Sequence, residues 1–191
     1  MLRDSDQHST RVFFALWPDA ETAAHLHKIA LQWQKKLGGR VTRSDSIHAT
    51  LVFVGNIPTD QLPALLALPV GIQLPAFDVS FDRADCWQHN QIAHLGMHQI
   101  PEPLRELQFE LDTRVRGLGL KIETRTYRPH LTLIRKAECD QTKTNANKNL
   151  AAKENPAMKP VTWSVRDFML VKSSISANGS RYEQIGRWPL L

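Results

Sequence analysis

The sequence predicts an α+β fold in which largely antiparallel sheets are covered by helices. Segments of strand character alternate irregularly with two long amphipathic patterns, and such mixed alternation is typical of this class. The tetrapeptide pattern His-x-Thr-Leu also occurs twice, starting at His48 and at His130, each time in a strand-like segment after a long helical pattern. We therefore expect two lobes related by a pseudo-twofold axis around a central cleft, within one domain spanning residues 1–191.

The first half of the chain predicts a strand, a helix and further strands. Residues 11–17 (RVFFALW) favour a strand that ends before Pro18, and Asp19 offers an N-cap for the helix that follows. This helix ends at Gly38 and Gly39, and its apolar residues recur at helical spacing: Ala23, Leu26, Ala30, Trp33 and Leu37. Further elements are expected as a strand over 47–55, a short helix over 60–68, and strands over 76–81 and 91–98.

The second half predicts one more long helix and then mostly strands. The helix covers residues 101–117, with an apolar stripe formed by Leu104, Leu107, Leu111, Val115 and Leu118. Strands are expected over 120–124, 129–135, 161–171 and 181–188. The polar stretch 136–160 is predicted to be a long surface loop, with 140–155 removable at little cost in stability. Residues 1–10 are predicted to be mobile.

Composition places the chain among ordinary globular proteins, with 42% hydrophobic and 23% charged residues. A net charge of +5 and a pI near 9.4 favour, weakly, a polyanionic partner. The apolar runs are too short and too often broken by proline to span a membrane, and the first ten residues are polar. We expect a cytoplasmic monomer, in which Cys86 and Cys139 are packing residues rather than a disulfide or a metal pair.

The repeated motif places a histidine and a threonine on one face of each strand. Side chains alternate along a strand, so the residues between and after them point to the opposite, apolar face. The same alternation assigns Phe53 to the buried face. If the strands are related by a twofold axis, two histidines and two threonines line one cleft.

This set of groups suits the cleavage of a phosphodiester. The attacking water must lose a proton and the leaving oxygen must gain one, and two imidazoles, which titrate near pH 6.5, divide these tasks. Threonine hydroxyls donate hydrogen bonds to non-bridging phosphate oxygens. Neither motif carries a carboxylate on the same strand face, and Asp45 precedes the first strand. We therefore expect acid–base chemistry with no metal ion and no cofactor.

At these residues the chain resembles the two-histidine (2H) phosphoesterase superfamily, and within it the bacterial and archaeal RNA 2′,3′-cyclic phosphodiesterases, historically called 2′-5′ RNA ligases. The resemblance rests on RVFFAL, IHATLVFVG, IAHLGM, RPHLTLIR and the closing segment with Gly179 and Tyr182. It implies a bilobal fold that acts on RNA with a 2′,3′-cyclic phosphate end and forms a 2′-phosphomonoester. His48 would then be the proton donor and His130 the proton acceptor, while Thr50 and Thr132 would hold the phosphate.

Three further residues are candidates for binding substrate. Arg135 suits a phosphate, but strict alternation puts it on the face opposite His130, so it reaches the cleft only if the strand ends or bulges there. Arg11 and Phe14 are expected to approach the cleft from the first strand.

Other polar and aromatic residues favour structural interpretations. Tyr127 could stack on a base, but it is interpreted as a packing residue. His89, His94 and His98 lie close together, yet no acidic or cysteine ligand completes a metal set, so we expect exposed histidines. His94 stands where an aromatic or aliphatic residue is expected, and we predict that it does not touch the catalytic pair.

Three other functions remain open from the sequence. An RNA-binding module without turnover would use the same cleft, although phosphate binding alone does not require two histidines. The same pair could act on 2′-5′ linkages or small cyclic nucleotides. It could also catalyse ligation, which is the reverse reaction.

Overall fold

The computed structural model describes residues 9–139, 159–176 and 179–191. Its main sheet has eight strands, seven of them in the order β10-β9-β1-β3-β7-β6-β5, with β2 added against β7. Their bounds are β1 Ser9–Leu16, β2 Arg40–Val41, β3 Ala49–Pro58, β5 Arg83–Trp87, β6 Ile92–Gly96, β7 His130–Arg135, β9 Asp167–Ser176 and β10 Gly179–Pro189. Strands β4 (Phe77–Phe81) and β8 (Val161–Val165) form a second sheet. The strand pairs are antiparallel, which confirms the predicted α+β class.

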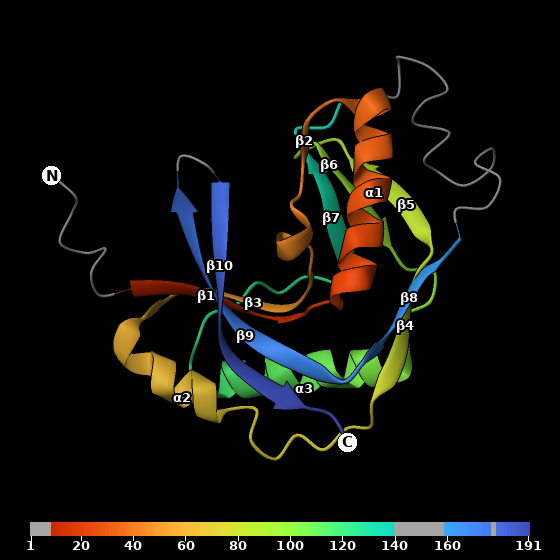
Figure 1. The fold of residues 1–191 in the computed structure, drawn as a ribbon. Helices are drawn as coiled ribbons and strands as arrows, with labels where there is room; N and C mark the ends of the chain where they lie inside the picture. Colours follow the sequence, from red (N-terminus) through yellow and green to blue (C-terminus); the bar gives the residue numbers. More distant parts are fainter. Residues whose placement is uncertain (1–8, 140–158, 177–178) are drawn as a thin grey trace, which may run out of the picture.

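The two motif strands lie at the centre of the main sheet and diverge from each other. Strand β3 pairs with β1, and β7 pairs with β6, over most of their lengths. Between β3 and β7 the register contains the single pair Ala49–Leu131. The sheet therefore consists of two parts joined at the point where the two His-x-Thr motifs lie side by side, with β9 and β10 at one end and β5 and β6 at the other (Figure 1).

The two long helices connect the two parts of the sheet, because each packs against the motif strand that is farther from it in the sequence. Helix α1 (Ala20–Leu37) begins at Asp19, whose carboxylate accepts a hydrogen bond of 2.8 Å from the Thr22 amide, and ends at Gly38. Although α1 precedes β3, it packs against β7 and β2, whereas α3 (Glu102–Gly117) precedes β7 and packs against β3 (Figure 1). Each motif strand is thus covered by the helix that precedes the other one.

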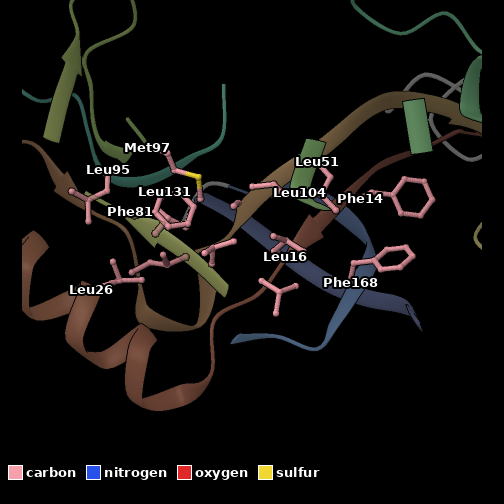
Figure 2. Close-up of a cluster of buried hydrophobic side chains, with 14 of the residues drawn as sticks. Phe14, Leu16, Leu26, Leu51, Phe81, Leu95, Met97, Leu104, Leu131 and Phe168 are labelled. Carbon is pink, nitrogen blue, oxygen red and sulfur yellow. The ribbon is translucent and has the colours of Figure 1, made fainter. Parts of the chain in front are cut away.

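This exchange gives the described residues one large hydrophobic core drawn from both parts of the sheet. The apolar residues predicted for α1 are buried, as are Leu104, Leu107, Leu111 and Val115 of α3, whereas Leu118 follows the helix and is 41% exposed. Phe14 is fully buried in the core beside Phe168 (Figure 2), and its ring lies 6.1 Å from that of Trp188. The prediction that Phe14 approaches the cleft is therefore wrong, because the face of β1 toward His48 carries its neighbour Phe13 instead.

Several boundaries differ from the sequence prediction. Strands β2 and β5 were not predicted, and residues 120–124 form no strand. The expected strand over 161–171 is divided between β8 and β9, and the helix over 60–68 is a 3₁₀ turn followed by α2 (Leu62–Ala67). Ser9 and Thr10, predicted to be mobile, begin β1. Residues 1–8 and 140–158, which include most of the predicted loop, lie outside the described part. None of the described helices is long and apolar enough to cross a membrane.

The two cysteines form a disulfide, which corrects their interpretation as packing residues. Cys86 lies on β5 and Cys139 follows β7, with their Cα atoms 5.8 Å apart. This distance is within the range that a disulfide requires. The sequence separation of 53 residues hides the contact, since it arises only because β5 reaches β7 through β6. Nothing in the sequence pattern predicted β5.

Candidate active site

A cleft of about 890 Å³ opens where β3 and β7 meet, and both His-x-Thr motifs line it. The two motifs contribute His48, Thr50, His130 and Thr132. The remaining walls come from β2, from the turn between β5 and β6, from residues 122–128 and from the start of β10. His48 directly precedes β3, and His130 is the first residue of β7. The fold thus brings together the two histidines and two threonines that were predicted to line one cleft.

Each motif strand bulges immediately after its threonine. In β3, Ala15 of β1 pairs with Thr50 and Phe14 pairs with Val52, so Leu51 is an extra residue. Leu51 and Val52 are accordingly both buried. A bulge shifts the alternation of side chains by one position. Phe53 therefore lines the cleft, and the prediction that it faces the core is wrong.

Strand β7 has the same irregularity at the matching position. His94 of β6 pairs with Thr132 and Ala93 pairs with Ile134, so Leu133 is the extra residue, and Leu133 and Ile134 are both buried. Arg135 consequently returns to the side of His130 and lines the cleft. Arg135 was expected to reach the cleft only if its strand ended or bulged there, and the strand does bulge.

The first motif histidine is held in one orientation by a backbone hydrogen bond and an aromatic box. Its Nδ1 lies 2.8 Å from the carbonyl oxygen of Ser46, which can only accept, so Nδ1 carries the proton and Nε2 is free. The rings of Phe13 and Trp17 stack on the imidazole at 4.9 and 4.8 Å, and Tyr182 meets it edge-on at 4.9 Å. This burial lowers the pKa of His48 to about 4, with smaller contributions from the positive charges of Arg135 and His130.

The second motif histidine uses the same backbone device in a different environment. The Nδ1 atom of His130 lies 2.9 Å from the carbonyl oxygen of Arg128, again leaving Nε2 free. Trp87 meets the imidazole edge-on at 4.6 Å, and His94 does so at 5.6 Å. Burial lowers the pKa of His130, and the cations Arg125 and Arg135 lower it further. Both motif histidines therefore favour the neutral form in the unliganded chain.

His94 contradicts two predictions. An exposed side chain was expected, but only 4% of the His94 surface is accessible. We also predicted that it would not touch the catalytic pair, but its ring meets that of His130. Its ring packs on Trp87 at 4.0 Å, and burial lowers its pKa to about 4. His89 and His98 are exposed, as expected. Within the described residues, no three His, Cys, Asp or Glu side chains are grouped so that they could hold a metal ion.

Five arginines line the cleft: Arg40, Arg43, Arg125, Arg128 and Arg135. They differ in whether a carboxylate neutralises their charge. Arg43 pairs with Asp45, and Arg125 pairs with Glu123 at 3.1 Å. Among the described residues, no carboxylate oxygen lies within ion-pair distance of the other three. The cleft therefore has positive charge available for an anion.

Two other candidate residues occupy its margins. Arg11 does not line the cleft, but its guanidinium lies 4.8 Å from the ring centre of Phe53, which does. Tyr127 lines the cleft, yet its hydroxyl is buried and finds no hydrogen-bond partner in the described part of the chain, and burial raises its pKa. No local pattern marks three further residues of the site: Phe13, Trp17 and Trp87. The first two depend on the register of β1 and the third on the unpredicted strand β5.

An antiparallel α+β fold whose cleft is lined by two His-x-Thr motifs is that of a two-histidine phosphoesterase. The chain matches the model of the LigT like phosphoesterase family over residues 16–93 and 95–182, and it belongs to this family.

Curated relatives and solved structures agree with this assignment. The RNA 2′,3′-cyclic phosphodiesterase of Escherichia coli K12 is 28% identical over 184 residues, covering 94% of this chain and 96% of the relative. The enzyme of the same name from Methanocaldococcus jannaschii is 26% identical, covering 93% and 99%. Crystal structures of E. coli LigT, without ligand and with 3′-AMP, each superpose with a TM-score of 0.76 at 28% identity. They cover 96% and 95% of this chain, respectively, and 98% of the LigT chain.

Proposed function

We propose that this chain hydrolyses 2′,3′-cyclic phosphate ends of RNA to 2′-phosphomonoesters. The observation that carries the proposal is the pair of imidazoles in one cleft, each with Nδ1 committed to a backbone carbonyl and Nε2 left to exchange a proton. The relatives named RNA 2′,3′-cyclic phosphodiesterase support the choice of substrate.

The asymmetry of the cleft supports the division of roles. The rings of Phe53 and Tyr182 line the cleft on the side of His48, so this side suits the nucleoside. The leaving 3′ oxygen belongs to the ribose and would therefore be nearer His48, the proposed proton donor. His130 would take a proton from the attacking water. The water oxygen bonds to phosphorus, the bond from phosphorus to the 3′ oxygen breaks, and His48 protonates that oxygen.

Three further groups would stabilise the negative charge of the phosphate in the transition state. The hydroxyls of Thr50 and Thr132 flank the two histidines on the same strand face, and each can donate one hydrogen bond to a non-bridging oxygen. Arg135 can donate two parallel hydrogen bonds to the same group. We propose that no metal ion takes part, since the two imidazoles already supply the acid and the base.

An RNA-binding module without turnover is supported less well. Binding would need the arginines and threonines, but it would not need two imidazoles with free Nε2 atoms. Hydrolysis of small cyclic nucleotides or of 2′-5′ linkages by the same pair is the second candidate, and the E. coli LigT structure with 3′-AMP fits a nucleotide-sized ligand in that protein.

The test uses a short RNA that ends in a 2′,3′-cyclic phosphate, incubated with the protein in excess EDTA. We expect conversion to the 2′-phosphate isomer, resolved from the 3′ isomer by chromatography against standards. Binding without conversion would support the binding module instead. Activity that EDTA abolishes and only a divalent metal restores would overturn the metal-independent mechanism.

Cytoplasmic location and a monomeric state remain predictions. Disulfides are uncommon in reducing compartments. Rapid alkylation of free thiols in intact cells would therefore show whether Cys86 and Cys139 are reduced where the protein works, and sedimentation would give its oligomeric state.

A further inference from the structure

Arg40 is held beside Arg135 by a backbone arrangement that only glycine permits. Strand β2 pairs with β7 so that Arg40 lies opposite Arg135 and Val41 opposite Ile134. The preceding residue, Gly39, has a φ of +77°, and a Cβ there would lie 2.7 Å from the carbonyl oxygens of Arg135 and Lys136. Any other residue at position 39 would push β2 away from β7.

The two guanidinium groups share the cleft, and the described residues supply no carboxylate that neutralises them. Among the described residues, neither Arg40 nor Arg135 has an ion-pair partner, whereas Arg43 beside them is paired with Asp45. Like charges on directly opposed residues of neighbouring strands are destabilising. Two adjacent unpaired arginines therefore suit the binding of anionic groups better than they suit stability.

The side chains of Arg40 and Arg135 reach different parts of the cleft. The charge of Arg135 acts on both motif histidines and lowers the pKa of each. The guanidinium of Arg40 instead reaches across to the start of β10, where its Nη1 lies 3.5 Å from the position that a Cβ of Gly179 would occupy. Arg40 is exposed whereas Arg135 is half-buried, so Arg40 lies toward the rim of the cleft.

We propose that Arg40 binds a second phosphate, the internucleotide phosphodiester that adjoins the cyclic end, so that the preferred substrates are oligonucleotides rather than cyclic mononucleotides. This inference rests on the proposed function. The reacting phosphate lies between the histidines with Arg135, and the backbone of the RNA leaves the cleft between β2 and the start of β10. An exposed arginine on a rim suits this task, because a guanidinium can donate two hydrogen bonds to one phosphodiester.

The experiment compares kcat/KM for a nucleoside 2′,3′-cyclic phosphate with kcat/KM for a dinucleotide that ends in the same cyclic nucleotide. We expect the wild type to prefer the dinucleotide about 10- to 100-fold, the range for a hydrogen bond to a charged group. Arg40→Met should lose most of this preference while turning over the mononucleotide within about twofold of the wild type. Arg40→Lys should keep part of the preference, because it retains the charge but not the paired donors.

A matched substrate and a matched variant complete the design. A dinucleotide with a neutral methylphosphonate linkage should react like the mononucleotide in the wild type, and it should show no further loss with Arg40→Met. Arg105→Met removes an exposed charge from α3 and should leave the preference unchanged. Equal rates on both substrates in the wild type, or an equal loss on both with Arg40→Met, would overturn the inference. If the wild type acts on neither substrate, the proposed function itself has failed.

Discussion

The two motif segments, His48–Phe53 and His130–Arg135, match over six positions, of which the first, third and sixth face the cleft. Both strands carry the bulge after the threonine, and both histidines hold Nδ1 against a carbonyl two residues earlier. The sixth position differs, since Phe53 offers an aromatic face and Arg135 a cation. A repeated backbone therefore supports two chemically different halves, one suited to a nucleoside and the other to a phosphate.

The neighbouring strands extend this difference. Strand β1 places the small side chain of Ala15 opposite Thr50, whereas β6 places His94 opposite Thr132. Around His48 the walls are the rings of Phe13, Trp17 and Tyr182, while His130 is walled by Trp87 and the third imidazole. The two motif histidines thus have similar hydrogen bonds and different neighbours, which is what separate roles require.

The largest expected effect comes from removing either motif histidine. His48→Gln and His130→Gln should each lower kcat on a cyclic-phosphate RNA by at least ~100-fold, because each removes general acid or general base catalysis. Since both groups act in one step, the double variant should lose much less than the product of the single losses. Single-turnover rates would measure this. Normal activity in either purified variant would remove that histidine from the mechanism.

The sixth positions should separate binding of the nucleoside from stabilisation of the phosphate. Arg135→Met should lower kcat about 10- to 100-fold, because a charge-assisted contact with the reacting phosphate is lost. Phe53→Leu should raise KM about 3- to 10-fold with little change in kcat, because stacking on the base is equal in the ground and transition states. Steady-state kinetics on one substrate would test both. The reverse pattern would show that the halves are assigned the wrong way round.

The pH dependence should reflect the burial of both histidines. The active form needs one imidazole neutral and the other protonated, so kcat/KM is bell-shaped, with its maximum midway between the two pKa values of the free chain. Both values are lowered from 6.5, that of His48 to about 4. The optimum should therefore lie below pH 6.5, and kcat/KM should fall as the pH rises above it. A rate profile from pH 4 to 9 that peaks above 7 would contradict this.

The sequence predicted the elements that local patterns control and missed those that depend on register. The helix of Ala20–Leu37 and the strand positions of both motifs follow from capping and periodicity. The meeting of His48 with His130 was expected from the repetition of the motif. The bulges at Leu51 and Leu133 leave no local signal, because a leucine fits either face, so Phe53 was misplaced and Arg135 stayed open. Strand β5 lacks a clear alternation of apolar and polar residues and was not predicted. Trp87 and the disulfide of Cys86 depend on this strand and were therefore not predicted either.

The last prediction concerns His94, and it is an effect on stability rather than on rate. The pKa of His94 is lowered to about 4 by burial, against 6.5 in the unfolded chain. A depressed value means that the neutral ring stabilises the fold fully above pH 6.5 and that this contribution is lost as the pH falls toward 4. The charges facing it, from His130, Asp85 and Arg83, modify this shift without reversing it. His94→Phe keeps an aromatic ring against Trp87 but removes the titration. Its free energy of unfolding should therefore fall by about 2–3 kcal/mol less than that of the wild type between pH 7 and pH 4.5. Urea unfolding at the two pH values measures the difference, with His89→Phe as the exposed control. If the wild type and both variants lost the same free energy of unfolding between the two pH values, His94 would gain its proton in the folded state as easily as in the unfolded chain.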